Sequence, residues 1–237
     1  MNRVFLFLFF TAAAAAQTTL MDHNLNAWSM YFGDHQIGQS KWGVHLEGQW
    51  RRADAGLSWQ QLLLRPGVNY QATPRLLLTA GYAFIDTHRY GDYPVPVKFP
   101  EHRFFQQAVW TQRAGRIDLQ SRFRLEQREL GQPGNAARPW RHENRFRYML
   151  RANVPLGQSK YYVGLYNELF VNYGRNVVGN HFDQNRAYVA LGRNLARQTR
   201  IEIGFLEQTL QRRGGVIWEH NHTLQLAVFS RLPFRRK

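Results

Sequence analysis

The chain has no cysteine, few lysines and, after its first residues, no run of eighteen apolar residues. Without cysteine, a small extracellular module held together by disulfides is excluded. Without a long apolar run beyond Gln17, a helical membrane protein is excluded. The 237 residues must therefore be held together by backbone pairing and packing, which suits a closed all-β domain.

The first residues have the pattern of an export signal. Arg3 supplies a positive charge, residues 4–10 are all apolar, and residues 11–16 end in small side chains suited to cleavage before Gln17. The apolar stretch is too short to span a bilayer as a helix. We predict a signal peptide at residues 1–16, followed by a single domain over residues 17–237.

The chain is strongly basic, with a net charge of +15 at pH 7. Such a balance favours polyanionic partners. For an exported chain the candidates are outer-membrane lipid, lipopolysaccharide and small anionic solutes. Nucleic acid is not expected, because the basic residues recur in segment after segment and do not gather in one patch.

Long segments alternate between apolar and polar residues with a period of two, which is typical of strands. The clearest runs from Arg116 to Leu130, where one face is apolar and the other carries a row of charged and amide side chains. On a helix these charges would spread around the axis. The predicted strands cover residues 40–51, 57–71, 75–87, 101–114, 115–130, 140–154, 159–173, 182–195, 198–213 and 217–231.

The connections between these segments alternate in length. Tight turns alternate with longer stretches, at 87–100, 131–139 and 174–181, that are rich in Gly, Pro or Asn. Short turns on one side and longer loops on the other are typical of outer-membrane barrels. We predict an all-β, antiparallel up-and-down transmembrane β-barrel of about ten strands with a charged lumen. The apolar segment 26–32 leaves open a count of twelve, or a segment tucked inside the barrel.

Several short motifs resemble a family of predicted outer-membrane barrels known only as domain of unknown function 2490. The motifs that carry the resemblance are Glu47-Gly48-Gln49-Trp50-Arg51, Gly81-Tyr82, Arg124-Leu125-Glu126-Gln127-Arg128, Arg145-Phe146-Arg147-Tyr148, Asn167-Glu168-Leu169-Phe170 and Phe182-Asp183-Gln184-Asn185-Arg186. The resemblance implies a barrel that is placed in the outer membrane by the barrel-assembly machinery. It implies no activity, cofactor or catalytic residue.

The rows of arginine and glutamate are the main candidate for function. If they point inward, ten of them converge as a lumenal charge network: Glu47, Arg51, Arg124, Glu126, Arg128, Glu143, Arg145, Arg147, Glu168 and Arg186. Guanidinium groups bind carboxylates and phosphates through paired hydrogen bonds. The network is therefore either a filter for small anions or a salt-bridged plug. Barrels with open aqueous channels have about sixteen strands, and the small size expected here favours the plug.

Aromatic and histidine residues offer further candidates. The seven tryptophans, Trp28, Trp42, Trp50, Trp59, Trp110, Trp140 and Trp218, are interpreted as girdles at the membrane interfaces, with a sugar-binding platform as the alternative. His220 and His222 share a face, but no third metal ligand stands at a suggestive spacing. No metal, cofactor or catalytic residue is therefore assigned.

Three functions remain open at this stage. The first is a structural barrel or a narrow pore that prefers anions. The second is an outer-membrane lipid hydrolase with its active site at the rim, although no Gly-x-Ser-x-Gly turn is present. The third is a soluble ligand-binding barrel, which would need apolar residues inside and polar residues outside.

Overall fold

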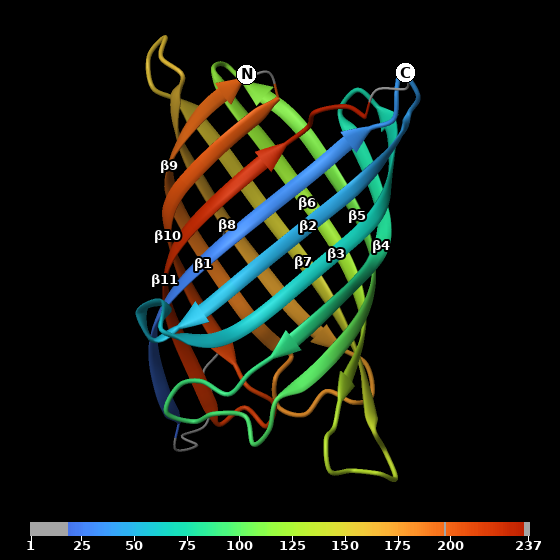
Figure 1. The fold of residues 1–237 in the computed structure, drawn as a ribbon, viewed down its shortest axis with the longest axis vertical. Coiled ribbons are helices and arrows are strands. Elements are labelled where there is room, and N and C mark those ends of the chain that lie inside the picture. Colours follow the sequence, from blue (N-terminus) through green and yellow to red (C-terminus); the bar gives the residue numbers. More distant parts are fainter. Residues whose placement is uncertain (1–18, 197, 235–237) are drawn as a thin grey trace, which may run out of the picture.

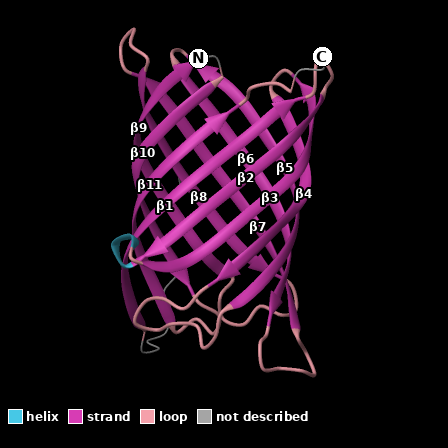
Figure 2. Cartoon of the chain, viewed as in Figure 1, coloured by secondary structure: helices cyan, strands magenta, loops and turns pink. Residues whose placement is uncertain are grey.

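The computed structural model describes residues 19–196 and 198–234, and in them eleven strands close into one barrel (Figures 1 and 2). The strands are β1 (Leu20–Gln36), β2 (Trp42–Ala53), β3 (Ser58–Thr73), β4 (Leu76–Thr87), β5 (Phe99–Ala114), β6 (Ile117–Gly131), β7 (Trp140–Pro155), β8 (Tyr161–Tyr173), β9 (Phe182–Ala196), β10 (Thr199–Gln211) and β11 (Ile217–Ser230). One 3-10 turn, η1 (Asp54–Gly56), joins β2 to β3. The predicted signal peptide, residues 1–16, lies outside the described residues.

The predicted all-β barrel is confirmed, and ten of its strands fall within a few residues of the expected ranges. The predicted count of ten or twelve is wrong, because segment 26–32 belongs to one additional strand, β1. The purely antiparallel arrangement is also wrong. With an odd number of up-and-down strands, the first and last run in the same direction. They pair in parallel, from Leu20 opposite Ile217 to Gly33 opposite Ser230.

The barrel is apolar outside and charged inside. On β6, Phe123 and Leu125 are 46% and 42% exposed, whereas the intervening Arg124 is 1% exposed. On β9, Val189 and Leu191 face outward while Arg186 is buried. A soluble barrel would need the opposite facing, so this arrangement argues against that alternative.

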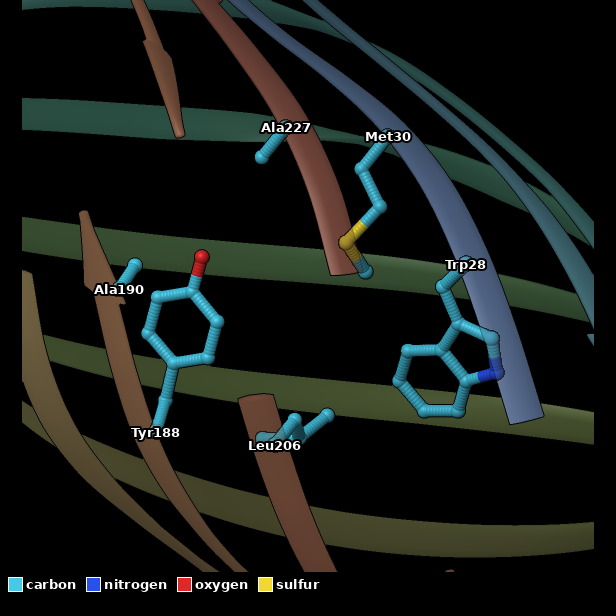
Figure 3. Close-up of a cluster of buried hydrophobic side chains, with 6 residues drawn as sticks. All are labelled: Trp28, Met30, Tyr188, Ala190, Leu206 and Ala227. Carbon is cyan, nitrogen blue, oxygen red and sulfur yellow. The ribbon is translucent and has the colours of Figure 1, made fainter. Parts of the chain in front are cut away.

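Two parts of the interior are apolar. The smaller consists of Leu63, Ala83 and Ile85 on β3 and β4. Trp28, Met30, Tyr188, Ala190, Leu206 and Ala227 form a buried cluster on β1, β9, β10 and β11 (Figure 3). Trp28 was expected in an interfacial girdle, and this prediction is wrong. It shares the inward parity of Asn24 and Asn26, is 2% exposed and donates a hydrogen bond from Nε1 to Gln60 Oε1 at 2.6 Å. The other six tryptophans lie on the outward parity of their strands.

The two ends of the barrel differ. The longest connections, residues 88–98, 132–139 and 174–181, lie together at the lower end of Figure 1, which we call the loop end. The opposite end, the short-turn end, has two-residue connections at 74–75 and 115–116. Among the residues that the structure describes, no helix is long and apolar enough to cross a membrane.

Candidate functional site: a charged lumen with two chambers

Glu126 lies at the centre of a network of ion pairs inside the barrel. Its side chain is fully buried, and five arginines from β3, β5, β6 and β7 surround it. Glu126 accepts hydrogen bonds from Arg145 Nη2 at 2.6 Å and from Arg147 Nη1 at 2.8 Å. The remaining guanidinium nitrogens within 4 Å belong to Arg103 at 3.4 Å, Arg65 at 3.7 Å and Arg124 at 3.9 Å. We call these six residues the Glu126 belt.

Three carboxylates outside the belt form ion pairs with its arginines. Glu47 lies 2.5 Å from Arg65 Nη1, and Asp183 lies 2.6 Å from Arg145 Nη1. Glu168 accepts from both Arg122 and Arg147 at 2.8 Å. Because each of these carboxylates is itself buried, the belt depends on its partners for charge compensation.

Two phenylalanine rings pack between the guanidinium groups. Arg65 and Arg124 lie 5.4 and 5.1 Å from the centre of the Phe105 ring. Arg147 lies 4.2 Å from the ring centre of Phe170, which is 1% exposed. Aromatic faces attract cations, most strongly where water is excluded. Phe170, on the inward face of β8, thus stabilises the neighbouring guanidinium groups.

The structure places all ten residues of the predicted network inside the barrel, each of them buried. Eight lie within 4 Å of an opposite charge: Glu47, Arg124, Glu126, Arg128, Glu143, Arg145, Arg147 and Glu168. Arg51 donates only to the amides of Gln49 and Gln61 and stacks on Trp28, with 4.1 Å to the ring centre. Arg186 forms no hydrogen bond or ion pair with any described residue, and stacks on Trp28 and Phe170.

Sequence reasoning missed several partners in this network. Glu101 and Arg103 share the inward face of β5, and their two-residue spacing could have identified them. Arg65 is hidden in the sequence, because it follows an apolar run and precedes Pro66. Its role depends on the pairing of β3 with its neighbours, which the local pattern does not encode.

The lumen contains two main chambers on either side of the belt. The short-turn chamber, of about 440 Å³, reaches Gln198 and Arg231 at the short-turn end. Seven arginines and three carboxylates line it: Arg122, Arg124, Arg147, Arg151, Arg186, Arg200 and Arg231, with Asp34, Glu47 and Glu168. The lining therefore has more cations than anions, and two of its arginines, Arg147 and Arg151, are paired with Glu126 and Glu202, which are not part of the lining.

The loop-end chamber, of about 990 Å³, is partly covered by the connection 88–98. Tyr90 of this connection donates a hydrogen bond to Glu219 Oε2 at 2.8 Å, and Arg212 donates to the carbonyl of Tyr93. Burial and the adjacent Glu219 carboxylate raise the pKa of Tyr90 above its ordinary value. The connection is thus anchored to β11 and to the turn that precedes it.

The histidines singled out in the sequence lie on the outer face, where β1 meets β11. His222 lies 2.6 Å from Glu207 and 3.4 Å from His23. His23 and Glu207 are neighbours that sequence spacing could not reveal, because they come from β1 and β10. Within the described residues, no His, Asp and Glu group has the arrangement needed to hold a metal ion.

Hydrolytic chemistry at a serine would require a histidine beside the hydroxyl. In the lumen, His45 lies beside two carboxylates, with Nδ1 2.8 Å from Asp34 Oδ1 and Nε2 3.6 Å from Glu47 Oε2. Among residues 19–196 and 198–234, no serine hydroxyl is hydrogen-bonded to a histidine. The geometry therefore gives no support to a serine hydrolase.

Comparison with known proteins gives one family. The family model described as a protein of unknown function (DUF2490) matches residues 25–220, from within β1 into β11. An uncharacterized protein of Methylorubrum extorquens is 31% identical over 182 residues, which cover 72% of each chain. No solved structure matches the chain significantly.

Proposed function

The chain belongs to the DUF2490 family, a family of unknown function, and from that premise we propose that it is an exported outer-membrane β-barrel that binds small anions in its lumen. A signal peptide at residues 1–16 would direct export. The lumen would bind anionic solutes, and the Glu126 belt would close it to free ion flow.

The main support for this proposal is that apolar side chains point outward from the barrel. Apolar residues such as Val68, Phe104 and Ile203 point outward and are 54%, 58% and 54% exposed. A monomeric soluble protein rarely exposes such a continuous apolar surface. In lipid this surface is buried, while the closed barrel satisfies its backbone hydrogen bonds internally. The strands have 12 to 17 residues, more than the roughly 9–11 that a tilted membrane strand needs.

Exposed aromatic residues support the membrane placement. Trp42, Trp110 and Tyr161 lie at strand ends toward the short-turn end. Trp59 and Trp140 lie at strand starts toward the loop end. Aromatic girdles at both interfaces are typical of outer-membrane barrels.

The two ends of the barrel suggest its orientation. Outer-membrane barrels have short turns in the periplasm and longer loops outside. The loop end carries four exposed arginines in its connections, at Arg89, Arg138, Arg175 and Arg213. These cations suit the phosphates of lipopolysaccharide, which we propose as the neighbouring lipid on that side.

The charges of the lumen favour the binding of anions, but the belt would block the passage of ions. Nine arginines and nine carboxylates are buried, and the belt arginines between the chambers are paired with Glu126 and with the surrounding carboxylates. The short-turn chamber nevertheless has an excess of cations. A small anion would therefore bind there in preference to a cation.

Refolding into vesicles tests the membrane placement. The mature chain, denatured in urea, is diluted into phosphatidylcholine vesicles and floated on a density gradient after a carbonate wash. We expect the protein to float with the vesicles and to run as a compact, heat-modifiable band in gels. Recovery in the carbonate wash, with no compact band, would refute the proposed membrane barrel.

A further inference from the structure

We infer that the short-turn chamber is a binding site for an anionic amphiphile, a molecule with a phosphate or carboxylate head and an apolar tail. The inference rests on the proposed function, because it assigns the ligand class of the same lumen. Three features of the chamber support the inference: guanidinium nitrogens without a hydrogen-bond partner in the described chain, an apolar wall and an opening on the short-turn side.

Four arginines that line this chamber each have a buried guanidinium nitrogen without a hydrogen-bond partner among the described residues. These nitrogens are Nε of Arg122, Arg186 and Arg200, and Nη1 of Arg124. Arg122, Arg124 and Arg200 also lie within 4 Å of a carboxylate of the described residues, whereas Arg186 does not. A buried donor without an acceptor costs free energy, and more so when it is charged. Four such donors around one cavity indicate that an acceptor belongs inside it. An oxyanion supplies several acceptor atoms at once.

Arg186 is the most informative of these residues. It is 7% exposed, and its guanidinium lies 5.4 and 4.8 Å from the ring centres of Trp28 and Phe170. Aromatic faces hold the cation in position without using its hydrogen-bond donors. The side chain is therefore fixed in place while its donors stay available to a ligand.

The wall facing the β6 and β7 arginines is apolar. The buried cluster of Figure 3 continues into Phe32, Tyr166 and Phe229, which pack against it. Met30, Phe32, Tyr166 and Phe229 line the chamber itself. Phe32 and Phe229 stack with their ring centres 5.0 Å apart. An inorganic anion would leave this wall in contact with water, whereas an apolar tail would cover it.

The chamber extends to the short-turn end, where Gln198 and Arg231 are exposed. Arg200 stands near this opening, with its guanidinium 4.5 Å from the Phe229 ring centre. The cavity volume of about 440 Å³ lies in the range of roughly 300–1,000 Å³ that small-molecule sites occupy. A single short chain with one anionic head suits this space.

Octyl phosphate is a suitable probe for this site. The mature protein, refolded in a non-ionic detergent, is titrated with octyl phosphate, with inorganic phosphate and with octanol, each corrected with a detergent blank. We expect one molecule of octyl phosphate to bind per barrel. Inorganic phosphate and octanol should each bind at least tenfold more weakly, because phosphate lacks the apolar tail and octanol lacks the anionic head.

Two variants and a matched control locate the binding. Arg186→Gln and Arg200→Gln should each weaken octyl phosphate binding about tenfold or more. Arg186 lines both chambers, whereas Arg200 lines only the short-turn chamber, so the loss in Arg200→Gln assigns the ligand to that chamber. Arg51→Gln is the control, because Arg51 is also buried, also stacks on Trp28 and also has no ion pair, but borders only the loop-end chamber. Its affinity should stay within twofold of the wild type.

Several outcomes would overturn the inference. Equal losses in Arg51→Gln and Arg186→Gln would show a general charge effect. If inorganic phosphate binds as tightly as octyl phosphate, the apolar tail contributes nothing to the affinity and the ligand is not an amphiphile. If the protein floats with vesicles but binds no octyl phosphate, this inference fails and the proposed barrel stands. If the protein does not enter vesicles, the proposed function itself fails.

Discussion

Two arginine environments in this barrel differ in how charge is compensated. In the Glu126 belt, Arg145 and Arg147 lie within 2.8 Å of carboxylate oxygens. On the wall of the short-turn chamber, Arg186 has only the faces of Trp28 and Phe170. These three arginines are all buried, but only the two in the belt lie beside carboxylates. The belt therefore has the features of a structural ion-pair network. The chamber wall has the features of the anion-binding site proposed above.

The largest effect is expected at the centre of the belt. Glu126→Gln would leave five arginines around a neutral amide. We expect the free energy of unfolding to fall by about 3–5 kcal/mol, because the buried cations lose their shared counterion. Urea unfolding of the refolded protein, followed by tryptophan fluorescence, measures this change. An unchanged midpoint would show that the belt is not held together by Glu126.

The second effect tests the two faces of one strand. β9 carries Arg186 inward and Val189 outward, the latter 48% exposed. Val189→Arg would place a charge on the proposed lipid face and should cost about 2–4 kcal/mol in vesicles. Leu57→Arg is the control, because Leu57 follows η1 at the loop end and is 82% exposed. Equal stability of both variants in vesicles would contradict a lipid-facing β9.

The third effect is expected at the loop end, where the uncharged hydroxyl of Tyr90, not an arginine, donates to the carboxylate of Glu219. The hydrogen bond from Tyr90 to Glu219 should contribute about 1 kcal/mol to anchoring connection 88–98. The pKa of Tyr90 is raised in the folded state, so this contribution is complete below the ordinary tyrosine pKa of 10.0. It is lost as the pH rises above that value, because the unfolded state then releases the proton first.

Cleavage by subtilisin measures the anchoring of this connection. In the wild type, cleavage within residues 88–98 should accelerate above pH 10, relative to cleavage of connection 132–139. Tyr90→Phe should be cleaved faster at pH 8 and lose the additional alkaline acceleration. A wild type and variant with the same pH profile would show that Tyr90 does not anchor the connection.

The smallest effect is expected at the chamber wall. Arg186→Gln removes two cation–π contacts but also removes a buried charge that has no carboxylate partner. We expect the free energy of unfolding to stay within about 1 kcal/mol of the wild type. A loss as large as that of Glu126→Gln in the same urea titration would show that Arg186 is part of the belt.

Much of the fold could be predicted from the sequence, because alternation with a period of two is strong on β6 and β7. β1 escaped prediction as a full strand, because its inward face carries Asp22, Asn24 and Asn26, residues that are common in turns. Its parallel pairing with β11 depends on the total number of strands. No local pattern contains that number.

The candidate site was only partly predictable. The row containing Arg124 and Glu126 showed that charges face one side together. Which arginine meets which carboxylate depends on register and barrel curvature, and the contact between Arg145 and Asp183 spans 38 positions of sequence. Trp28 was placed on the wrong face, because an aromatic residue suits either an interfacial girdle or an interior packed with cations.

Ion conductance across a planar bilayer tests the central claim most directly. The refolded protein is added to one side of a bilayer under a salt gradient, with insertion verified by flotation of the same preparation. A barrel closed by the Glu126 belt should insert without sustained current, and any brief openings should reverse toward the anion potential. Sustained, cation-selective steps would contradict both the closed belt and the excess of cations in the short-turn chamber.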